Sequence, residues 1–188
     1  MQVRPTDLLT LLGLALIWGS SYILIKWGLQ VFTPIQVASL RVGLSALAVA
    51  PFVVRHFRRI ERRWLPLLLV VGLTGTALPS FLFPFAQTQL SSSLTGMLSG
   101  LTPLCTFLVA WLGFRNAPRQ RQVIGLLMGL VGAILLAYAS PGQGGGTTQL
   151  LYAGFILLAC FCYATSSNLV ANYFRDLPSL TITVTSFS

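Results

Sequence analysis

The sequence predicts an all-α polytopic membrane protein, a helical bundle with six full transmembrane helices and the start of a seventh. Composition is the first reason: 55% of the 188 residues are hydrophobic and 8% are charged, whereas soluble domains carry about 25% charged residues. Length is the second, because apolar runs of about 20 residues, enough to cross a bilayer core, recur along the chain. The third is that basic residues gather in the links between these runs.

The apolar runs are separated by short polar or basic links. The full-length spans are predicted at 8–26, 34–54, 65–86, 91–114, 122–138 and 150–172, and a seventh begins near residue 179. Asp7 can cap the first span, and Pro34 suits the start of the second. The third span contains Pro79 and Pro84, which should bend or break the helix.

The fourth span carries a packing signal. Small residues recur at every fourth position, at Ser92, Gly96 and Gly100, and such a stripe lets another helix approach closely in lipid. A proline, Pro103, is tolerated in a membrane helix where neighbours satisfy the freed carbonyl. We therefore expect one packed helix here, at the centre of the bundle.

Charge in the links predicts the orientation. Ten of the 12 basic residues lie in segments 1–7, 55–63, 115–121 and 173–178. Links 27–33, 87–90 and 140–149 hold none. Since basic loops stay in the cytoplasm, the amino terminus is predicted to be cytoplasmic, in a plasma membrane of bacterial type. The net charge of +9 therefore reports topology, and we expect the lipid bilayer as a partner and no nucleic acid.

A weak internal repeat supports a transporter-like architecture. The segment WGSSYILIK at 18–26 aligns with YATSSNLVA at 163–171, an offset of 145 residues. Five predicted spans separate the two copies, so the second copy enters the membrane from the opposite side. This arrangement is the inverted repeat that many transporters share.

Several motifs resemble the EamA-type branch of the drug/metabolite transporter superfamily. They are W-G-S-S with a terminal lysine in the first span, T-P-x-x-x-x-x-x-R from Thr33 to Arg41, S-S-S-L-x-x-x-L-S-x-L-T-P-L in the fourth span, and Q-x-x-G-L-L-x-G-L-x-G-x-I-L-L at 122–136. The resemblance implies ten helices in two inverted five-helix repeats that export or exchange small metabolites, amino-acid-like or drug-like compounds. Arg115 and Tyr163 stand where the family usually has glutamate and often has tryptophan.

The resemblance also divides the chain. It implies a first five-helix repeat at 1–140, a flexible Gly-rich external loop at 141–149, and the start of a second, incomplete repeat at 150–188. We expect a fragment of a chain of about 290 residues, by doubling the repeat. Such a fragment should not transport alone, and its partner would be the missing second repeat or an oligomer partner. The alternative function is a non-transporting membrane fragment or assembly component.

Two charges lie at membrane depth, Lys26 and Arg41. Arg41 is about 10 Å along its helix from Pro34, and charges at such depth usually mark a pathway or a partner. Arg41 could attract an anionic group such as a substrate carboxylate, or it could be a structural arginine satisfied by carbonyls, hydroxyls or water. Lys26 could belong to the same pathway, or it could extend to the outer interface.

Aromatic and hydroxyl side chains complete the predicted substrate pathway. Trp18, Ser21 and Tyr22 share one face of the first helix, as a pocket or as a helix contact. Phe81 and Phe85 flank the prolines of the third span, where they could line a site or face lipid. The predicted pathway residues are Trp18, Ser21, Tyr22, Lys26, Arg41, Phe81, Phe85 and Thr95.

The sequence offers no chemistry for an enzyme. The one histidine, His56, lies in a basic link, and all three carboxylates lie in predicted cytoplasmic segments. A hydrolase would need a base beside its nucleophile within the membrane. The three cysteines form no C-x-x-C pair and Gly144–Gly146 lacks G-K-[ST], so we expect neither a metal nor a cofactor.

Overall fold

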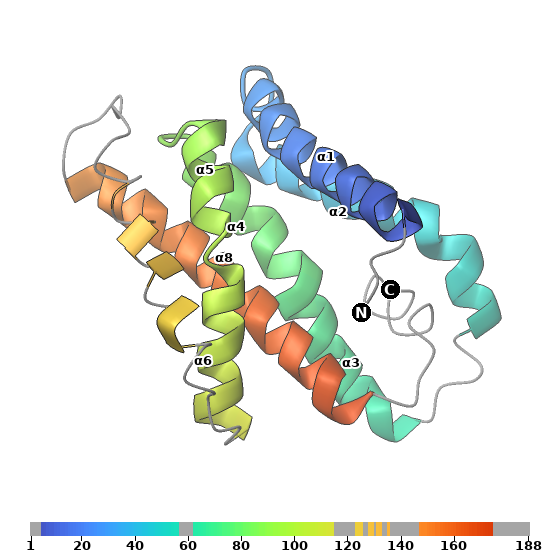
Figure 1. Cartoon of the computed structure of the whole chain (residues 1–188). Helices are drawn as coiled ribbons and strands as arrows, with labels where there is room; N and C mark the ends of the chain where they lie inside the picture. Colours follow the sequence, from blue (N-terminus) through green and yellow to red (C-terminus); the bar gives the residue numbers. More distant parts are fainter. Residues whose placement is uncertain are drawn as a thin grey trace.

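The computed structural model of the chain is a bundle of helices (Figure 1). It describes residues 5–56, 62–114 and 147–174, with positions 123–125, 128–129, 131–132 and 135 between them. Within these residues, five helical stretches are long and apolar enough to cross a membrane: Thr6–Gly28, Pro34–Pro51, Leu65–Gln87, Ser92–Phe114 and Gln149–Tyr173. Five predicted spans are thus confirmed. Much of the predicted span 122–138 and all of the one beginning near residue 179 lie outside the described residues.

The first two helices, α1 (Pro5–Gly28) and α2 (Pro34–His56), are joined by a short link. The start of α2 is fixed by a reciprocal cap. The Thr33 N–H donates to Gln36 Oε1 at 2.9 Å, and the Gln36 N–H donates to Thr33 Oγ1 at 3.3 Å. Two backbone donors that lack intrahelical partners are satisfied in this way. Pro34 takes the first helical position, as predicted.

The third span is interrupted, as its prolines predicted. It consists of α3 (Leu65–Gly72), a π-helical turn η3 (Leu73–Ala77) and α4 (Leu78–Gln87), preceded by the short 3-10 turn η2 (Arg62–Trp64). Pro79 has no N–H, and its ring would clash with the carbonyl one turn earlier. The wider turn relieves that clash, and the Leu78 N–H bonds to Leu73 O. Pro84, in contrast, lies inside α4 without ending it.

The expectation of one continuous helix in the fourth span is wrong. The span divides into α5 (Ser92–Ser99) and α6 (Thr102–Phe114). Pro103, in the first turn of α6, cannot donate to the carbonyl of Ser99, four residues earlier. Thr102 Oγ1 donates to that carbonyl instead, at 2.6 Å. A hydroxyl side chain thus makes the break inexpensive inside the membrane.

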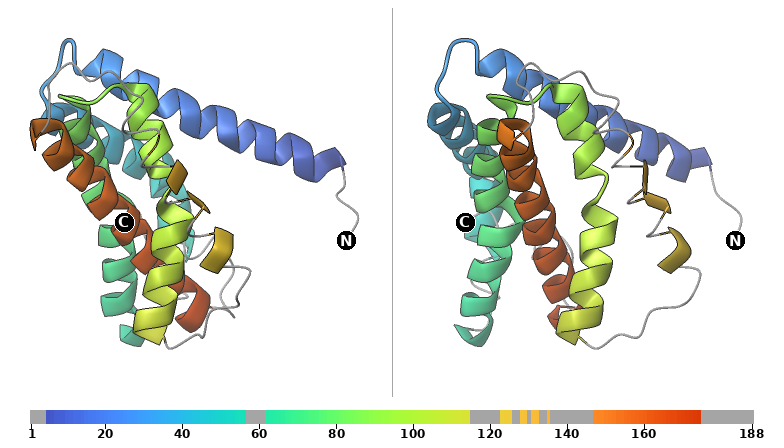
Figure 2. Two further views of the ribbon diagram at one scale, coloured as in Figure 1. Left: turned by 60° about the vertical axis from the view of Figure 1, so that its left-hand side comes forward. Right: turned by 90° about the vertical axis from the view of Figure 1, so that its left-hand side faces the viewer.

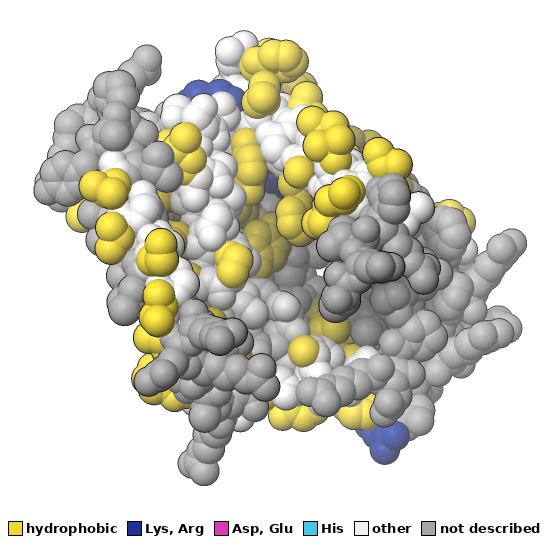
Figure 3. Space-filling view, in the orientation of Figure 1, with side chains coloured by type: hydrophobic (Ala, Val, Ile, Leu, Met, Phe, Trp, Pro, Cys, Tyr) yellow, Lys and Arg dark blue, Asp and Glu magenta, His cyan; other side chains and the backbone are white. Residues whose placement is uncertain are grey.

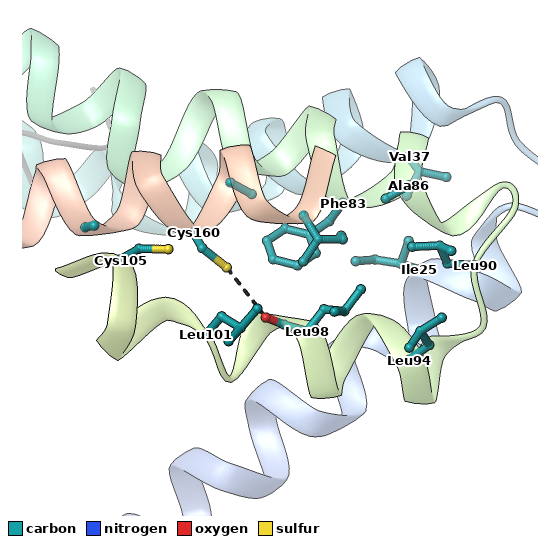
Figure 4. Packing of buried hydrophobic residues seen from close by; sticks show 13 residues of the cluster. Ile25, Val37, Phe83, Ala86, Leu90, Leu94, Leu98, Leu101, Cys105 and Cys160 are labelled. Atoms are coloured by element: carbon teal, nitrogen blue, oxygen red, sulfur yellow. Dashed lines mark hydrogen bonds between the residues drawn. The ribbon is translucent and has the colours of Figure 1, made fainter. Parts of the chain in front are cut away.

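The centre of the bundle belongs to α8 (Thr147–Tyr173) and not, as expected, to the fourth span. It packs along both α4 and α6 (Figure 2). Its fully buried residues are Ile156, Ala159, Cys160 and Ala164. They join a core cluster that α1, α2, α4, α5 and α6 complete (Figure 4).

The predicted small-residue stripe is only partly at a helix contact. A Cβ added at Gly96 would lie 3.5 Å from the ring of Tyr22 in α1. Ser92 is half-buried, whereas Gly100 is exposed at the break between α5 and α6.

A smaller cluster forms at the opposite end of the bundle. Leu68, Val71 and Phe174 are buried there, and the rings of Trp64 and Phe174 are 5.3 Å apart. We call this end the Trp64 end. The end at which α1 and α4 finish and α2 and α5 begin is the Lys26 end.

Candidate functional site

A cluster of polar and aromatic side chains lies toward the Lys26 end of the bundle. The ring of Phe83 in α4 contacts Tyr22 of α1, with ring centroids 5.6 Å apart, and Tyr163 of α8, at 6.1 Å. Phe83 is 3% exposed, so the two tyrosines meet it within the bundle. Three helices thereby converge on one aromatic side chain.

Arg41 of α2 belongs to the same cluster. Its guanidinium interacts electrostatically with Tyr163 and Tyr22. Its Nη1 atom is buried and has no hydrogen-bond partner. An unpaired donor of a charged group inside a protein costs more than a neutral one, so it points to a missing partner.

Tyr22 is held by a chain of two hydrogen bonds. Its hydroxyl donates to Ser99 Oγ at 2.7 Å, and Ser99 Oγ donates to Gly96 O at the same distance. Ser99 is the last residue of α5, immediately before the break. Gly96 packs beside the tyrosine ring, which would lie 3.5 Å from a Cβ added there. The helix break and the small residue together position this hydroxyl.

Lys26 lies one helical turn beyond Tyr22, nearer the Lys26 end. Its ammonium donates to two backbone carbonyls, Gln87 O at 2.7 Å and Leu90 O at 3.0 Å. Gln87 is the last residue of α4 and Leu90 lies three residues beyond it, where intrahelical donors are lacking. Lys26 therefore caps α4 and ties α1 to it, a role that neither sequence alternative contained.

The side chain of Gln87 is a second unsatisfied polar group. It is 0% exposed, and neither Nε2 nor Oε1 has a hydrogen-bond partner. Gln87 follows Phe83 by four residues, so both lie on the buried face of α4.

The structure separates the predicted pathway residues into two groups. Tyr22, Lys26 and Arg41 lie together at the Lys26 end, as described above. Thr95 is fully buried, and its hydroxyl donates to Ser91 O at 2.9 Å. Ser21 is half-buried and donates to Trp18 O at 2.7 Å.

The other predicted residues lie at the surface of the described bundle. Trp18 is 70% exposed, and Phe81 and Phe85 are 36% and 37% exposed. On α4 the buried ring is Phe83, between them in sequence. Side chains two residues apart point to different sides of a helix, and the aromatic run by itself could not select the side.

Sequence reasoning missed Phe83, Gln87 and Ser99 as members of the cluster. The available signal was spacing. Phe83 and Gln87 are four residues apart on a helix that has no other side-chain amide, and Ser99 comes shortly before Gly100 and Pro103. Tyr163 was noticed through the repeat register, and the structure brings it to Arg41 and Phe83.

A thiol pair lies deeper in the core. Cys105 and Cys160 are free and buried, and Thr102 Oγ1 donates to Cys160 Sγ at 3.4 Å. The Cys160 thiol in turn faces Leu98 O at 3.8 Å (Figure 4). Among the described residues no group of three metal-ligating side chains occurs. These thiols act as small packing residues with a weak hydrogen bond.

The outer surface agrees with a lipid environment. Figure 3 shows hydrophobic side chains spread over the described helices on one face, with basic side chains at few points. A groove of about 450 Å³ lies on α2. Its lining consists of Phe32, Gln36, Ser39, Leu40, Gly43, Leu44 and Leu47. Arg41 does not line this groove.

The arrangement of the cluster can bind an anionic or zwitterionic group. It offers one guanidinium donor, an ammonium, tyrosine hydroxyls and aromatic faces, and Asp7 is the one acidic residue among those that the structure describes. Arginine donors suit carboxylates, and aromatic faces suit cations.

Comparisons with known proteins agree on one class. Residues 6–138 match the EamA-like transporter family. An uncharacterized transporter of Archaeoglobus fulgidus is 21% identical over 123 residues, which are 65% of this chain and 44% of that protein. The uncharacterized transporter YdfC of Bacillus subtilis is 23% identical over 172 residues, 89% of this chain and 55% of YdfC. The chain thus spans about half the length of these curated relatives, and no solved structure matches it.

Proposed function

Since the chain belongs to the EamA-like transporter family, we propose that it carries small metabolites across a plasma membrane, by export or exchange, through alternating access. The observation that carries the proposal is the buried Arg41 Nη1 atom without a hydrogen-bond partner, beside Tyr22 and Tyr163. In a membrane transporter, a charge at such depth with an unused donor is a natural contact for a substrate.

The substrate class follows from the chemistry of the cluster. Arg41 would bind a carboxylate, and Phe83, Tyr22 and Tyr163 would pack against the rest of the molecule or its ammonium group. Amino-acid-like or drug-like compounds with an anionic group fit this set. Trp18, Phe81 and Phe85 would lie at the edge of the pathway, where a second set of helices could cover them.

Alternating access requires two halves that move around a site between them. We propose that residues 1–140 form one EamA-type repeat, and that α8 opens a second repeat of inverted orientation. The Lys26 end would face outside and the Trp64 end the cytoplasm, as the basic links indicate. The matched residues cover only 44% and 55% of the relatives, which supports a requirement for a second half.

The test is substrate flux in proteoliposomes, using a panel of amino acids, organic anions and organic cations. We expect saturable flux from the chain extended by a second EamA repeat, and none from residues 1–188 alone. Arg41→Met should reduce flux of anionic and zwitterionic substrates about 10- to 150-fold, the worth of one hydrogen bond to a charged group. Flux of cations should change less.

The matched control is Arg41→Lys, which retains the charge but loses the planar fork. It should recover part of the anion flux. Equal loss for every substrate together with a reduced folding yield would make Arg41 structural. No flux from either chain would contradict the carrier itself, and flux from residues 1–188 would contradict the need for a second half.

A non-transporting membrane component is the second candidate function. The matched residues cover 44% and 55% of the relatives, and an inverted-repeat carrier needs both of its halves around the site. The same flux experiment separates the two functions.

A further inference from the structure

The contact between Lys26 and α4 is the main polar tie at the end of α1. The ammonium holds the carbonyls of Gln87 and Leu90 at 2.7 and 3.0 Å. An ammonium has three N–H donors, so one donor remains after these two bonds. The tie therefore caps α4 while keeping the capacity to bind a further acceptor.

The rest of α1 adds little to this attachment. Its large apolar side chains between residues 8 and 18 are all exposed. In Figure 2, the carboxyl-terminal end of α1 meets the other helices and its amino-terminal part stands away from α4 and α6. Ile25, Tyr22 and Lys26 are the side chains that join α1 to the described core. Loss of the Lys26 bonds would thus loosen the helix.

The unsatisfied amide of Gln87 belongs to the same residue as one carbonyl of this tie. The ammonium binds the backbone carbonyl of Gln87 at 2.7 Å, so the tie and the unpartnered amide meet at one position of α4. The amide is fully buried, and neither of its polar atoms has a partner. A buried amide in this state costs free energy unless a water or a ligand completes it.

We propose that Lys26 and Gln87 form a carboxylate site at the Lys26 end, and that a bound carboxylate competes with the α4 carbonyls for the ammonium. The site rests on the proposed function only in that its ligand would be a transported molecule. The ammonium would pair with the carboxylate, and the Gln87 amide N–H would donate to its second oxygen.

The competition has a direction. An ammonium binds an ionised carboxylate more strongly than a neutral carbonyl. The negative pole at the end of α4 repels a carboxylate that stays beside the carbonyls, so the ion pair is favoured away from them. A carboxylate therefore draws Lys26 away from Gln87 O and Leu90 O and leaves α1 without its tie. Binding at this site opens the Lys26 end of the bundle between α1 and α4.

Hydrogen exchange of residues 1–188 in lipid nanodiscs tests the proposal. The probe is lactate, and lactamide is its neutral counterpart. We expect lactate to accelerate exchange about threefold in residues 27–33 and 88–91, a small fraction of the effect of a full opening. Lactamide should leave the exchange unchanged. Lys26→Met should show the faster exchange without lactate and no further response.

Two glutamine variants separate the site from the tie. Gln87→Leu keeps the backbone carbonyls and removes the unsatisfied amide, so its exchange without lactate should be no faster than in the unmodified protein. Its apparent lactate affinity should fall about tenfold. Gln89→Leu, a change at an exposed neighbour, should behave like the unmodified protein. If Gln87→Leu fails to fold, Gln87→Glu serves instead, because its like charge should abolish the lactate response.

The outcomes are decisive in both directions. Faster exchange with lactate that requires both Lys26 and Gln87 supports the site. The site would be overturned by an equal response to lactamide, by an unchanged lactate affinity of Gln87→Leu, or by no response to lactate. A water molecule would then be the partner of the Gln87 amide. None of these readouts needs flux. A lactate response in hydrogen exchange, together with no flux in proteoliposomes, would therefore contradict only the proposed function.

Discussion

Helices α1 and α8 occupy equivalent positions in the proposed repeat, yet the bundle holds them very differently. Their spans are similarly apolar, with mean hydropathy 2.0 and 1.7. α8 has four residues at 0% exposure in its middle third, at Ile156, Ala159, Cys160 and Ala164. Among the described residues of α1, Ile25 is the buried hydrophobic residue.

The difference shows that hydropathy does not decide which membrane helix is buried. Lipid is as apolar as leucine, so close packing and hydrogen bonds between helices decide instead. α8 presents small residues to its neighbours and donates from Asn168 to Thr106 O at 2.9 Å. α1 has leucines along most of its length and is tied mainly through Tyr22 and Lys26.

The largest expected effect is at the closest approach of α8 to the third span. A Cβ at Gly75 would lie 2.5 Å from Ser166 Oγ and 3.2 Å from its Cβ, whereas nothing lies within 4 Å of Gly19 in α1. Gly75→Leu should destabilise the protein by about 1–3 kcal/mol through overpacking. Gly19→Leu should be neutral or slightly stabilising, since leucine favours helix over glycine.

Thermal unfolding in detergent measures both variants. Ser166→Ala in the Gly75→Leu background should recover part of the loss, because it removes the nearest atom. Equal stability of Gly75→Leu and Gly19→Leu would mean that this contact is not tight and that the comparison of the two helices fails there.

An intermediate effect is expected at the hydrogen bonds of α8. Asn168 is 6% exposed and donates to both Thr106 O and Ala164 O. Asn168→Leu should cost about 0.6–1.7 kcal/mol, the range of single hydrogen bonds between membrane helices. Asn172→Leu is the control, because Asn172 is exposed and bonds only within its own helix in the structure. A loss as large at Asn172 would show that the interhelical bond is not the cause.

A smaller effect is expected at the hydroxyl that joins α1 to α5. Tyr22→Phe removes the 2.7 Å bond to Ser99 and should cost about 0.6 kcal/mol. Ser99→Ala should cost a similar amount, and the double variant should cost no more than either single one. Additive losses would indicate that the two side chains act separately.

The smallest effect is expected on the exposed face of α1. Trp18→Leu should change stability by less than about 0.5 kcal/mol, because the side chain is 70% exposed and contributes no buried core. Unfolding of the purified protein measures it. A substantially larger loss would reveal contacts of Trp18 beyond the described residues.

The fold was predictable where length and composition decide it. Five spans agree with the described helices to within a few residues. An interruption of the third span was predictable, but which proline interrupts a helix was not: Pro79 follows a π-turn, Pro84 lies inside a helix and Pro103 lies in the first turn of one. Whether a proline breaks a helix depends on which group donates to the carbonyl that the proline leaves free. For Pro103 that carbonyl is Ser99 O, and the donor is the Thr102 hydroxyl.

The candidate site was predictable only through its charges. Lys26 and Arg41 could be recognised because charge at membrane depth is costly and rare. Their surroundings could not, because Gln87, Ser99 and Tyr163 lie 46 to 137 residues away from these charges in the sequence. The same holds for the aromatic candidates Trp18, Phe81 and Phe85. The sequence showed which helices carry aromatic side chains but not which face of each helix is buried.

The sequence by itself determined that this chain lies in a membrane. It also determined the residue ranges of most of the spans and the family that the chain resembles. These features follow from lengths, loop charges and motifs, and the bilayer imposes them on each segment separately. Only the tertiary structure decided that α8 is central, that the fourth span breaks at Gly100, and that Lys26 caps α4. The physical reason is that association within lipid depends on short-range packing and hydrogen bonds between distant segments, and no single segment encodes its partner.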